Sequence, residues 1–301
     1  MQHKTHILVL GAQGKLGRLL AGAWENARPE QRPKHLIAHW QSTKNLRAGD
    51  IIWSPGMAWP EGLPQFEAIV ALWGVTPATK HVGPAPEGDH LAENCALAQA
   101  AMDLGRVLGV KRVLHCSTAA VYEPSPDPLR EEQAGGALNH YGAAKLAMER
   151  AIGEDVAAHP DGPTQCILRI ANFAGADSLF AGLDRGDGPI TLDQFDDGQG
   201  PMRSYLTPSG LGQAIEALLQ CPRAALPDVL NVAAPGAVAM ADLVRAAGRE
   251  VAWKPAPQGA APRVELDVAR LRAICSECRP QSARDIVADV ARARGEAKGS
   301  T

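Results

Sequence analysis

The sequence has few aromatic residues, no strong excess of charge and no long apolar run. Aromatic residues make up 4% of the 301 residues, and only three are tyrosines: Tyr122, Tyr141 and Tyr205. The formal net charge of −3 gives no basic surface of the kind that usually binds nucleic acid, so we expect no nucleic-acid partner. No apolar run approaches the ~20 residues of a membrane-spanning helix, so we expect no membrane association.

Cysteines are also few. Of the six, Cys116 and Cys166 lie in apolar runs, where cysteine behaves as a small hydrophobic residue. Cys275 and Cys278 form one C-x-x-C pair, but zinc needs a second pair or nearby histidines, so incidental thiols are favoured over metal or redox chemistry and no metal is predicted. The N-terminus leads into the apolar run His6–Leu10 without a charged leader or cleavage site. We therefore expect a protein of the reducing cytoplasm.

Short apolar runs alternate with helical patterns along most of the chain. The runs are continuous, as expected for strands that helices cover on both faces. The predicted strands are Ile7–Leu10, Leu36–His39, Ala68–Trp73, Arg112–Cys116, Cys166–Ile170 and Val229–Val232, and the predicted helices are Lys15–Trp24, His90–Leu108, Tyr141–Val156 and Gly210–Leu219. This order predicts an α/β fold with a Rossmann-type, doubly wound parallel sheet.

The C-terminal part of the sequence is less regular. The segment Ala174–Ser204 is rich in Gly and Asp and predicts loops with one short strand at Ile190–Leu192. A Pro- and Ala-rich stretch at Lys254–Pro262 precedes a final helical segment at Ala283–Ala293. We therefore predict a dinucleotide-binding domain and a smaller, irregular substrate region: residues 1–172, joined again by about 205–233, and residues 173–301.

A glycine-rich turn follows the first predicted strand and opens the first predicted helix. It reads Gly11-Ala12-Gln13-Gly14-Lys15-Leu16-Gly17. Glycines permit a tight turn and let the backbone approach a pyrophosphate, while the helix N-terminus supplies free N–H groups and the positive end of the dipole. The position between a strand and an amphipathic helix favours a dinucleotide site over a turn without a ligand.

The second predicted strand lacks the acid that often bonds the ribose hydroxyls of NAD. Residues 35–42 read HLIAHWQS. The usual anchor for NAD is missing, and so is the repulsion that an acid would exert on the 2′-phosphate of NADP. Lys15, Lys34 or Lys44 can supply positive charge, so the expected cofactor is NAD or NADP, with a slight lean to NADP.

Of the three tyrosines, only Tyr141 has a lysine four residues later, Lys145. This spacing puts both side chains on one face of a helix. A free tyrosine has a pKa near ~10, but a neighbouring ammonium and a bound cationic nicotinamide favour the phenolate and lower that pKa. The phenol can then exchange a proton with a substrate hydroxyl while hydride moves to or from the nicotinamide. The alternative is a half-buried tyrosine beside a solvated lysine.

Two hydroxyls, Ser117 and Thr118, follow the predicted strand Arg112–Cys116. Ligands of open α/β sheets bind at the carboxyl ends of the strands, so a hydroxyl here can hold a substrate oxygen against Tyr141. The alternative is the ordinary turn chemistry of a Ser-Thr pair.

These motifs, in this order, resemble those of the extended short-chain dehydrogenase/reductase family, the NAD-dependent epimerase/dehydratase group. The resemblance covers nearly the whole chain. It rests on Gly11–Gly17, Gly49-Asp50-Ile51 after a short third strand, Asn94 in the helix before Val110–Val113, Ser117–Tyr122, Tyr141–Lys145, Leu168–Gly175, Arg203–Leu206, Asn231–Ala233 and Leu266–Leu271.

The resemblance implies a role for each matching residue. The catalytic set would be Thr118, Tyr141 and Lys145. The cofactor-binding set would be Gly11, Gln13, Gly14, Lys15, Leu16, Gly17, Asp50, Ile51, Leu72, Trp73, Gly74, Ser117 and Lys145. Asn172 and Arg203 would face the substrate, with Arg263 a weaker candidate for its phosphate. In this scheme Tyr141 is the acid/base, and Lys145 bonds the nicotinamide ribose.

One departure from the family pattern narrows the range of reactions that we predict. The 4,6-dehydratases carry an Asp-Glu pair directly after the catalytic hydroxyl, where this sequence has Ala119 and Ala120. We therefore predict an NAD(P)-dependent oxidoreductase or epimerase that acts on a secondary alcohol or ketone, with a sugar or sugar nucleotide as a candidate, and not a 4,6-dehydratase. The alternative is a non-catalytic NAD(P)-sensing regulator of the same fold, which usually loses the tyrosine or the lysine. Family members often dimerise through the Tyr-Lys helix, so a homodimer is expected.

Overall fold

A seven-stranded parallel sheet lies at the centre of the computed structural model, within the described residues 4–28, 32–33, 35–43, 49–76, 90–136 and 139–296. In chain order the strands are β1 (Thr5–Leu10), β2 (Leu36–Ser42), β3 (Ile51–Ile52), β4 (Ala68–Ala71), β5 (Arg112–Thr118), β6 (Thr164–Ile170) and β11 (Val229–Val232). They are ordered β11-β6-β5-β4-β1-β2-β3, and every neighbouring pair is parallel. The predicted Rossmann-type sheet is confirmed.

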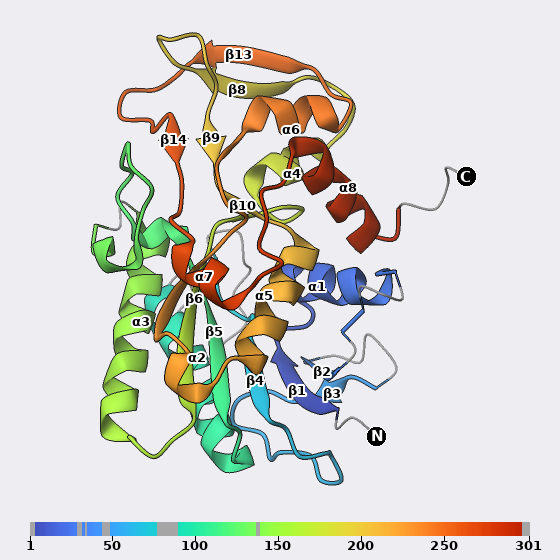
Figure 1. Ribbon diagram of the computed structural model, residues 1–301, viewed down its shortest axis with the longest axis vertical. Helices are drawn as coiled ribbons and strands as arrows, with labels where there is room; N and C mark the ends of the chain where they lie inside the picture. Colours follow the sequence, from blue (N-terminus) through green and yellow to red (C-terminus); the bar gives the residue numbers. More distant parts are fainter. Residues whose placement is uncertain are drawn as a thin grey trace.

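Helices cover both faces of this sheet (Figure 1). On one face α2 (His90–Leu108) packs against α3 (His140–Ala158), and on the other α1 (Lys15–Glu25) packs against α5 (Pro208–Gln220). Alternate strand residues serve the two faces: Ile7 and Val9 join the core under α1, while Leu8 and Leu10 join the core under α2. Burial on both faces explains why the strands are continuously apolar in the sequence.

Several strand ends differ from the sequence prediction. β1 and β6 begin two residues earlier, at Thr5 and Thr164, and β2 runs on to Ser42 instead of ending at His39. β4 stops at Ala71 instead of Trp73, because the chain leaves the sheet after Leu72 and passes beside the glycine-rich turn. β5 runs on to Thr118 instead of ending at Cys116, because Ser117 and Thr118 still pair with β6. The candidate hydroxyls therefore lie on the last two residues of the strand.

The third strand is also displaced from its predicted place. β3 pairs with β2 only through Ile51 and Ile52, so Asp50 precedes the strand instead of following it. A strand of two residues carries no periodicity that a sequence could reveal.

Shorter elements lie beyond the carboxyl end of the sheet, at the top of Figure 1. Three small sheets pair β7 (Asn172–Phe173) with β10 (Tyr205–Leu206), β8 (Ile190–Gln194) with β13 (Val251–Pro255), and β9 (Met202–Arg203) with β12 (Val238–Ala239) and β14 (Arg263–Val264). The helices there are α4 (Ser178–Leu183), α6 (Met240–Ala246) and α8 (Ala283–Ala293), while α7 (Ala269–Ile274) lies lower, against β11 and α5. The segment expected to be loops with one strand thus also contains α4 and β9, and the apolar residues of α4 join a core shared with α6 and α8.

Helix α8 crosses α1 at close range. A Cβ on Gly22 would lie 1.9 Å from the carbonyl oxygen of Ala293, so glycine is required where the two backbones meet. This crossing fastens the C-terminal elements to the central sheet.

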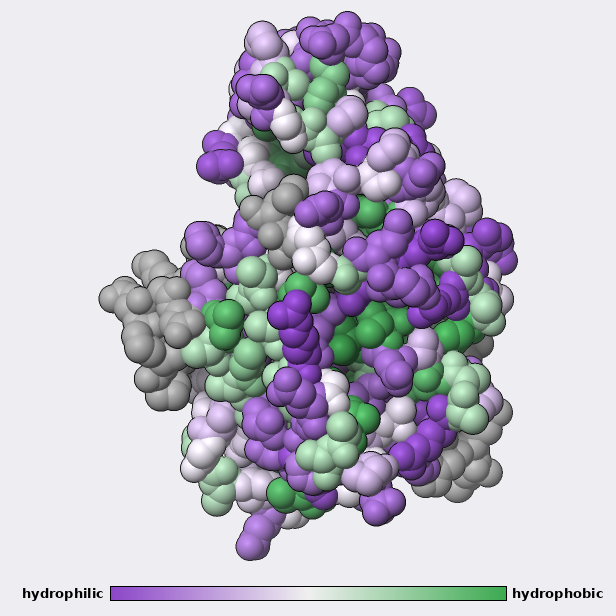
Figure 2. All heavy atoms as spheres, turned by 90° about the vertical axis from the view of Figure 1, so that its left-hand side faces the viewer, coloured by the Kyte–Doolittle hydropathy of each residue, from purple (hydrophilic) through white to green (hydrophobic). Residues whose placement is uncertain are grey.

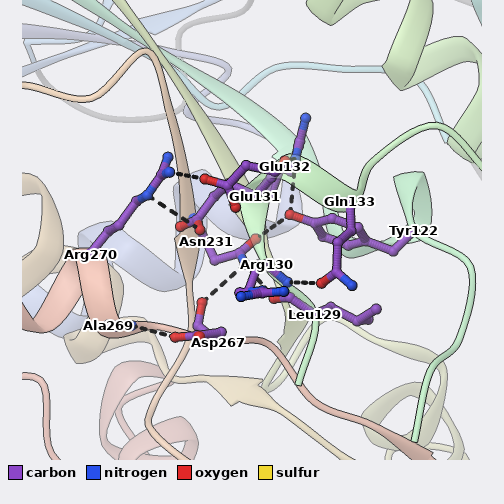
Figure 3. A network of polar contacts seen from close by, with 11 residues as sticks. Tyr122, Leu129, Arg130, Glu131, Glu132, Gln133, Asn231, Asp267, Ala269 and Arg270 are labelled. Carbon is purple, nitrogen blue, oxygen red and sulfur yellow. Dashed lines mark hydrogen bonds and ion pairs between the residues drawn. The ribbon is translucent and has the colours of Figure 1, made fainter. Parts of the chain in front are cut away.

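Asn231 on β11 connects three distant segments (Figure 3). Its side chain accepts a hydrogen bond from the hydroxyl of Tyr122 and donates to the carbonyls of Leu129 and Asp267. Its backbone N–H donates to Glu131 of the short 3₁₀ helix η3 (Glu131–Gln133). Its side-chain amide and its backbone N–H are satisfied although the residue is fully buried, so it fixes the loop after β5 against β11 and the approach to α7.

The face at the left of Figure 1, which carries α3, is shown in Figure 2. Hydrophilic and hydrophobic residues are mixed on it. Large exposed hydrophobic side chains of the helix pair include Leu91 and Val107 on α2 and Val156 on α3. Across the described ranges, no helix is both long and apolar enough to cross a membrane.

Candidate active site

The glycine-rich turn between β1 and α1 has the backbone shape that a pyrophosphate site requires. Gly11 has φ +82°, and a Cβ there would lie 2.7 Å from the backbone nitrogen of Trp73. A Cβ on Gly17 would lie 2.5 Å from the carbonyl oxygen of Gly11. Gly14 precedes α1 and has no side chain to cover the helix N-terminus. The turn therefore fits a dinucleotide phosphate at the positive end of α1.

Gln41 holds this turn against the end of β2. Its buried side chain accepts a hydrogen bond from the backbone N–H of Gly11 (2.9 Å) and donates to the carbonyl of Trp53 (2.5 Å). Sequence reasoning registered the missing acid but missed this role of the glutamine. The available signal was an amide in an otherwise apolar strand, because a buried amide must find internal partners.

Lys145 is buried under the carboxyl end of the sheet. Its Nζ donates to the carbonyl of Cys116 on β5 (3.0 Å) and lies 3.6 Å from Sδ of Met148. A Cβ on Gly74 would lie 2.8 Å from Nζ, so the glycine after β4 leaves room for the ammonium. Burial lowers the pKa of Lys145 from its ordinary value because it disfavours the charged form.

Tyr141 lies on the first turn of α3, where its phenol lies close enough to Thr118, at the end of β5, to interact with it. The helix begins here because the side chain of Asn139 accepts a hydrogen bond from the N–H of Gly142 (2.8 Å). Burial raises the pKa of Tyr141 to about 12, and the nearby Cys116 thiol adds to the rise. The interaction with Thr118 only partly opposes this effect.

The direction of that pKa differs from the one expected from the Tyr-Lys spacing. In this structure the ammonium of Lys145 bonds the Cys116 carbonyl, and desolvation dominates at Tyr141. The phenol is therefore neutral at ordinary pH until further positive charge arrives. The structure nevertheless brings together Thr118, Tyr141 and Lys145 as the sequence predicts.

Ser117 does not join this group. Its hydroxyl donates to Oε1 of Glu149, which is itself paired with Arg169 of β6. Successive residues of a strand point to opposite faces, so Ser117 and Thr118 cannot both face one site. The cofactor role that the resemblance implies for Ser117 has no support in the position of its side chain.

The other cofactor candidates surround the turn. Ile51 and Leu72 are buried, Asp50 precedes β3, and Leu16 packs against the main core. Nζ of Lys15 lies 3.4 Å from the carbonyl of Ala176, so this ammonium reaches toward the C-terminal elements and not toward the end of β2. Lys34 and Lys44, the other two lysines considered for NADP, lie outside the described residues.

The candidate substrate residues belong to the small strands above the sheet. Nδ2 of Asn172 donates to Asp177 (3.2 Å). The guanidinium of Arg203 donates to the carbonyls of Met202, Ala261 and Pro262, and its burial lowers its pKa. These carbonyls hold Arg203 in place without neutralising its charge.

Arg263, the weaker candidate, is paired with a carboxylate. Its guanidinium forms an ion pair with Glu265 two residues later, and its third nitrogen lies 3.5 Å from Sδ of Met202. Its charge is already compensated, so Arg203 is the better anion ligand of the two.

Residues 7–210 match the NAD dependent epimerase/dehydratase family. This chain belongs to that family. A UDP-glucose 4-epimerase of Azospirillum brasilense is 44% identical over 70 residues, which are 23% of this chain and 20% of the relative. The match therefore spans about a fifth of that relative's length.

Solved structures share the fold along nearly the whole chain. A UDP-glucuronic acid 4-epimerase from Bacillus cereus, in complex with UDP-glucuronic acid and NAD, gives a TM-score of 0.73 at 15% identity and covers 97% of this chain and 99% of that chain. A UDP-glucose 4-epimerase from Brucella ovis, in complex with NAD, gives 0.71 at 18% identity and covers 95% and 97%. At such low sequence identity, these similarities establish that the proteins share a fold.

Asn94 is a further positioning residue in this epimerase/dehydratase family member. Its amide accepts from the N–H of Val75 (3.2 Å) and donates to the carbonyl of Val75 (3.1 Å) and to that of His90 (2.6 Å). It thereby fixes the chain after Gly74 beside Lys145. Asn94 is among the residues that carry the family resemblance in the sequence, but no role was assigned to it there, although asparagine usually prefers caps and turns to the interior of a helix.

Neither of the two residues directly after Thr118 is acidic in this family member. Ala119 and Ala120 form the short 3₁₀ helix η2 (Ala119–Val121), whose N-terminus is capped by the hydroxyl of Thr118.

The six cysteines are free thiols, and burial raises the pKa of Cys278 to about 11. Among the described residues, no cluster of three His, Cys, Asp or Glu side chains is arranged to hold a metal.

Proposed function

We propose that this chain is an NAD(P)-dependent oxidoreductase or epimerase that acts on a secondary alcohol or ketone. The observation that carries the proposal is the position of Tyr141 beside Thr118 at the carboxyl end of the sheet, with Lys145 buried one turn further along α3 and bonded to the carbonyl of Cys116. The family and the relatives, which include UDP-sugar 4-epimerases, make sugar nucleotides the first substrate class to test.

The residues divide the work as follows. The hydroxyl of Thr118 and the phenol of Tyr141 would both hydrogen-bond the reacting oxygen, and Tyr141 would take up or return its proton. When bound, an oxidised nicotinamide would accept hydride from the substrate carbon. Positive charge beside Tyr141 favours the phenolate and opposes the effect of burial. Lys145 and the turn at Gly11–Gly17 would bind the dinucleotide.

The elements divide in the same way. We place the dinucleotide in residues 1–172 together with about 205–233, and the substrate mainly on residues 173–301. Arg203 would bind an anionic group such as a nucleotide phosphate, because its guanidinium bonds backbone carbonyls and forms no ion pair with a carboxylate among the described residues. Asn172 would contact the same substrate.

Elimination of water is not part of this proposal. Ala119 and Ala120 provide no acid or base beside Thr118, so a 4,6-dehydratase reaction has no group to carry it. Detection of a dehydrated product from a sugar nucleotide would contradict this point.

The cofactor and the assembly need separate experiments. Protein purified with tightly bound nicotinamide would favour an epimerase, which must keep its cofactor through the cycle, and free exchange would favour net oxidation or reduction. Exposed Leu91, Val107 and Val156 on α2 and α3 support a homodimer, which light scattering can test.

The free thiols suit a reducing compartment, and we propose the cytoplasm.

The proposed function is tested by removal of one hydroxyl. Tyr141→Phe is expected to lower turnover of UDP-glucose, UDP-galactose or UDP-glucuronic acid by about 100-fold or more, the usual contribution of an acid/base. Dinucleotide binding, followed by calorimetry, should be retained. Unchanged turnover would contradict the assignment.

A second buried tyrosine provides the matched control. Tyr122→Phe removes a phenol that serves the Asn231 network and not the site, so turnover should stay within about twofold of the parent value. Tight dinucleotide binding with no turnover of any carbonyl compound would instead favour the regulator.

A further inference from the structure

The end of β2 and the start of α1 form a group of hydrogen-bond donors without a carboxylate. Nε2 of Gln13 donates to Oγ1 of Thr43 (2.6 Å), and the hydroxyl of Ser42 lies 3.5 Å from Oε1 of Gln13. The guanidinium of Arg18, one turn into α1, donates to the backbone carbonyl of Gln13. Four side chains from two elements thus meet beside the glycine-rich turn.

Arg18 carries an available charge at this place. Its side chain is exposed, and it forms no ion pair with a carboxylate in the described part of the chain. Thr43 is also exposed, and because its oxygen already accepts from Gln13, its own proton can be donated elsewhere. Both groups therefore offer donors to an acceptor that approaches the turn.

Gln41 cannot take the place of the missing acid. Both polar atoms of its side chain are used inside the protein, on Gly11 and Trp53. The next carboxylate along the sequence, Asp50, precedes β3, whose first residue pairs with Gln41, so it lies further toward the amino end of the strands than Thr43.

The sequence around these residues is also positively charged. Between Glu30 and Asp50 there is no Asp or Glu, and the Lys and Arg residues are Arg32, Lys34, Lys44 and Arg47. In Rossmann folds the adenosine ribose lies at the end of this strand, where an acid suits a free 2′-hydroxyl and an arginine suits a 2′-phosphate.

We propose that Gln13, Arg18 and Thr43 form a binding site for the 2′-phosphate of NADP, so that this chain prefers NADP to NAD. The inference rests on the proposed dinucleotide site and adds its specificity. A phosphate dianion accepts hydrogen bonds from guanidinium, amide and hydroxyl donors, which Arg18, Gln13 and Thr43 supply, while the buried Ser42 donates to Gln13 and supports it.

Calorimetric titration of the full chain with NADP⁺ and NAD⁺ tests the proposal, together with the fragment pair 2′,5′-ADP and ADP. NADP⁺ is expected to bind at least about tenfold more tightly than NAD⁺, and the two fragments should rank in the same order. Arg18→Gln should weaken NADP⁺ binding about tenfold and leave NAD⁺ binding within about twofold, because only the 2′-phosphate meets this charge.

Two further variants complete the test. Arg185→Gln is the matched control. Arg185 is also an exposed arginine that donates to a nearby backbone carbonyl, but it lies in the turn after α4. This variant should change neither the NADP⁺ nor the NAD⁺ affinity. Thr43→Asp, an exposed change that the fold tolerates, should reverse the preference toward NAD⁺ by repelling the phosphate.

Each outcome has a separate meaning. Equal or tighter binding of NAD⁺ by the parent protein, or an equal loss for both dinucleotides in Arg18→Gln, would overturn the 2′-phosphate site while the proposed oxidoreductase or epimerase stands. Failure to bind either dinucleotide would overturn both the site and the proposed function.

Discussion

His115 lies on β5, three residues before Thr118, and is buried within the sheet and its covering helices. Its Nε2 lies 2.7 Å from Oε1 of Gln165 on β6, and burial lowers its pKa to about 4. In the unfolded chain a histidine has a pKa of about 6.5. The folded protein therefore keeps this imidazole neutral at a pH where the unfolded chain protonates it.

This difference sets a pH dependence of stability. As pH falls from about 7 to 4, the unfolded state binds a proton that the folded state excludes, which costs about 3 kcal/mol of unfolding free energy. Below pH 4 the folded protein also binds it, and this contribution stops growing. Urea unfolding at pH 7 and pH 4 should show the loss in the parent protein and a correspondingly smaller one in His115→Gln. An identical pH dependence in both proteins would contradict the assignment.

At the same scale, the predictable part of the site is the part with a local pattern. Gly11, Gly17, Tyr141 and Lys145 could be found because a turn or a helix fixes the spacing within a few residues. Ser117 could not be placed, because its partner Glu149 lies on another element and draws the hydroxyl away from Thr118.

Charge states were equally invisible in the sequence. The pKa of Tyr141 depends on burial, and that of Arg203 on the desolvation imposed by segments far away in the chain. Spacing reveals which groups meet, but not how much water remains around them.

At the scale of elements, a buried ion pair joins α3 to the sheet. Nη2 of Arg169 on β6 lies 2.7 Å from Oε2 of Glu149 on α3, and both side chains are about 5% exposed (6% and 5%). Arg169 also donates to the hydroxyl of Tyr122 and to the carbonyl of Glu131, while Ser117 donates to Glu149. Glu149 is one turn beyond Lys145, so this contact sets the position of the helix that carries the site.

Breaking one side of this pair is expected to be costly. Glu149→Leu or Arg169→Met alone should lower the unfolding free energy by about 3–5 kcal/mol, because each leaves a buried charge unpaired. The double variant should regain much of this loss, since no unpaired charge remains. Urea unfolding of all four proteins gives the coupling energy. Additive losses in the double variant would show that the pair does not act as a unit.

The elements themselves were predictable in proportion to their length and burial. β1 and β4 are apolar on both faces along most of their length and stand out in the sequence. β9, β12 and β14 have two residues each and exist because segments more than thirty positions apart meet in space. Such strands depend on tertiary pairing, which no local pattern records.

At the scale of the whole molecule, the α1–α8 crossing joins the C-terminal elements to the sheet. Gly22→Ala would place a methyl group against the carbonyl of Ala293, so α8 must move. We expect a loss of about 1–3 kcal/mol in unfolding free energy, as for other overpacked contacts.

Gly153→Ala on α3 is the matched control for this change, because a Cβ there meets nothing within 4 Å. It should raise stability by about 0.5–1 kcal/mol through helix propensity. Both values come from urea unfolding of the full chain. A gain of the same size for Gly22→Ala would show that the crossing adjusts freely.

The same crossing has a consequence for the protein during its synthesis. Helix α1 spans residues 15–25 and its partner α8 spans residues 283–293, so the ribosome completes the second long after the first. At about 5–20 residues per second, the delay is on the order of tens of seconds. Throughout that interval the nascent chain carries an uncovered surface on its first helix, which gives holdase chaperones a site that disappears only when α8 emerges.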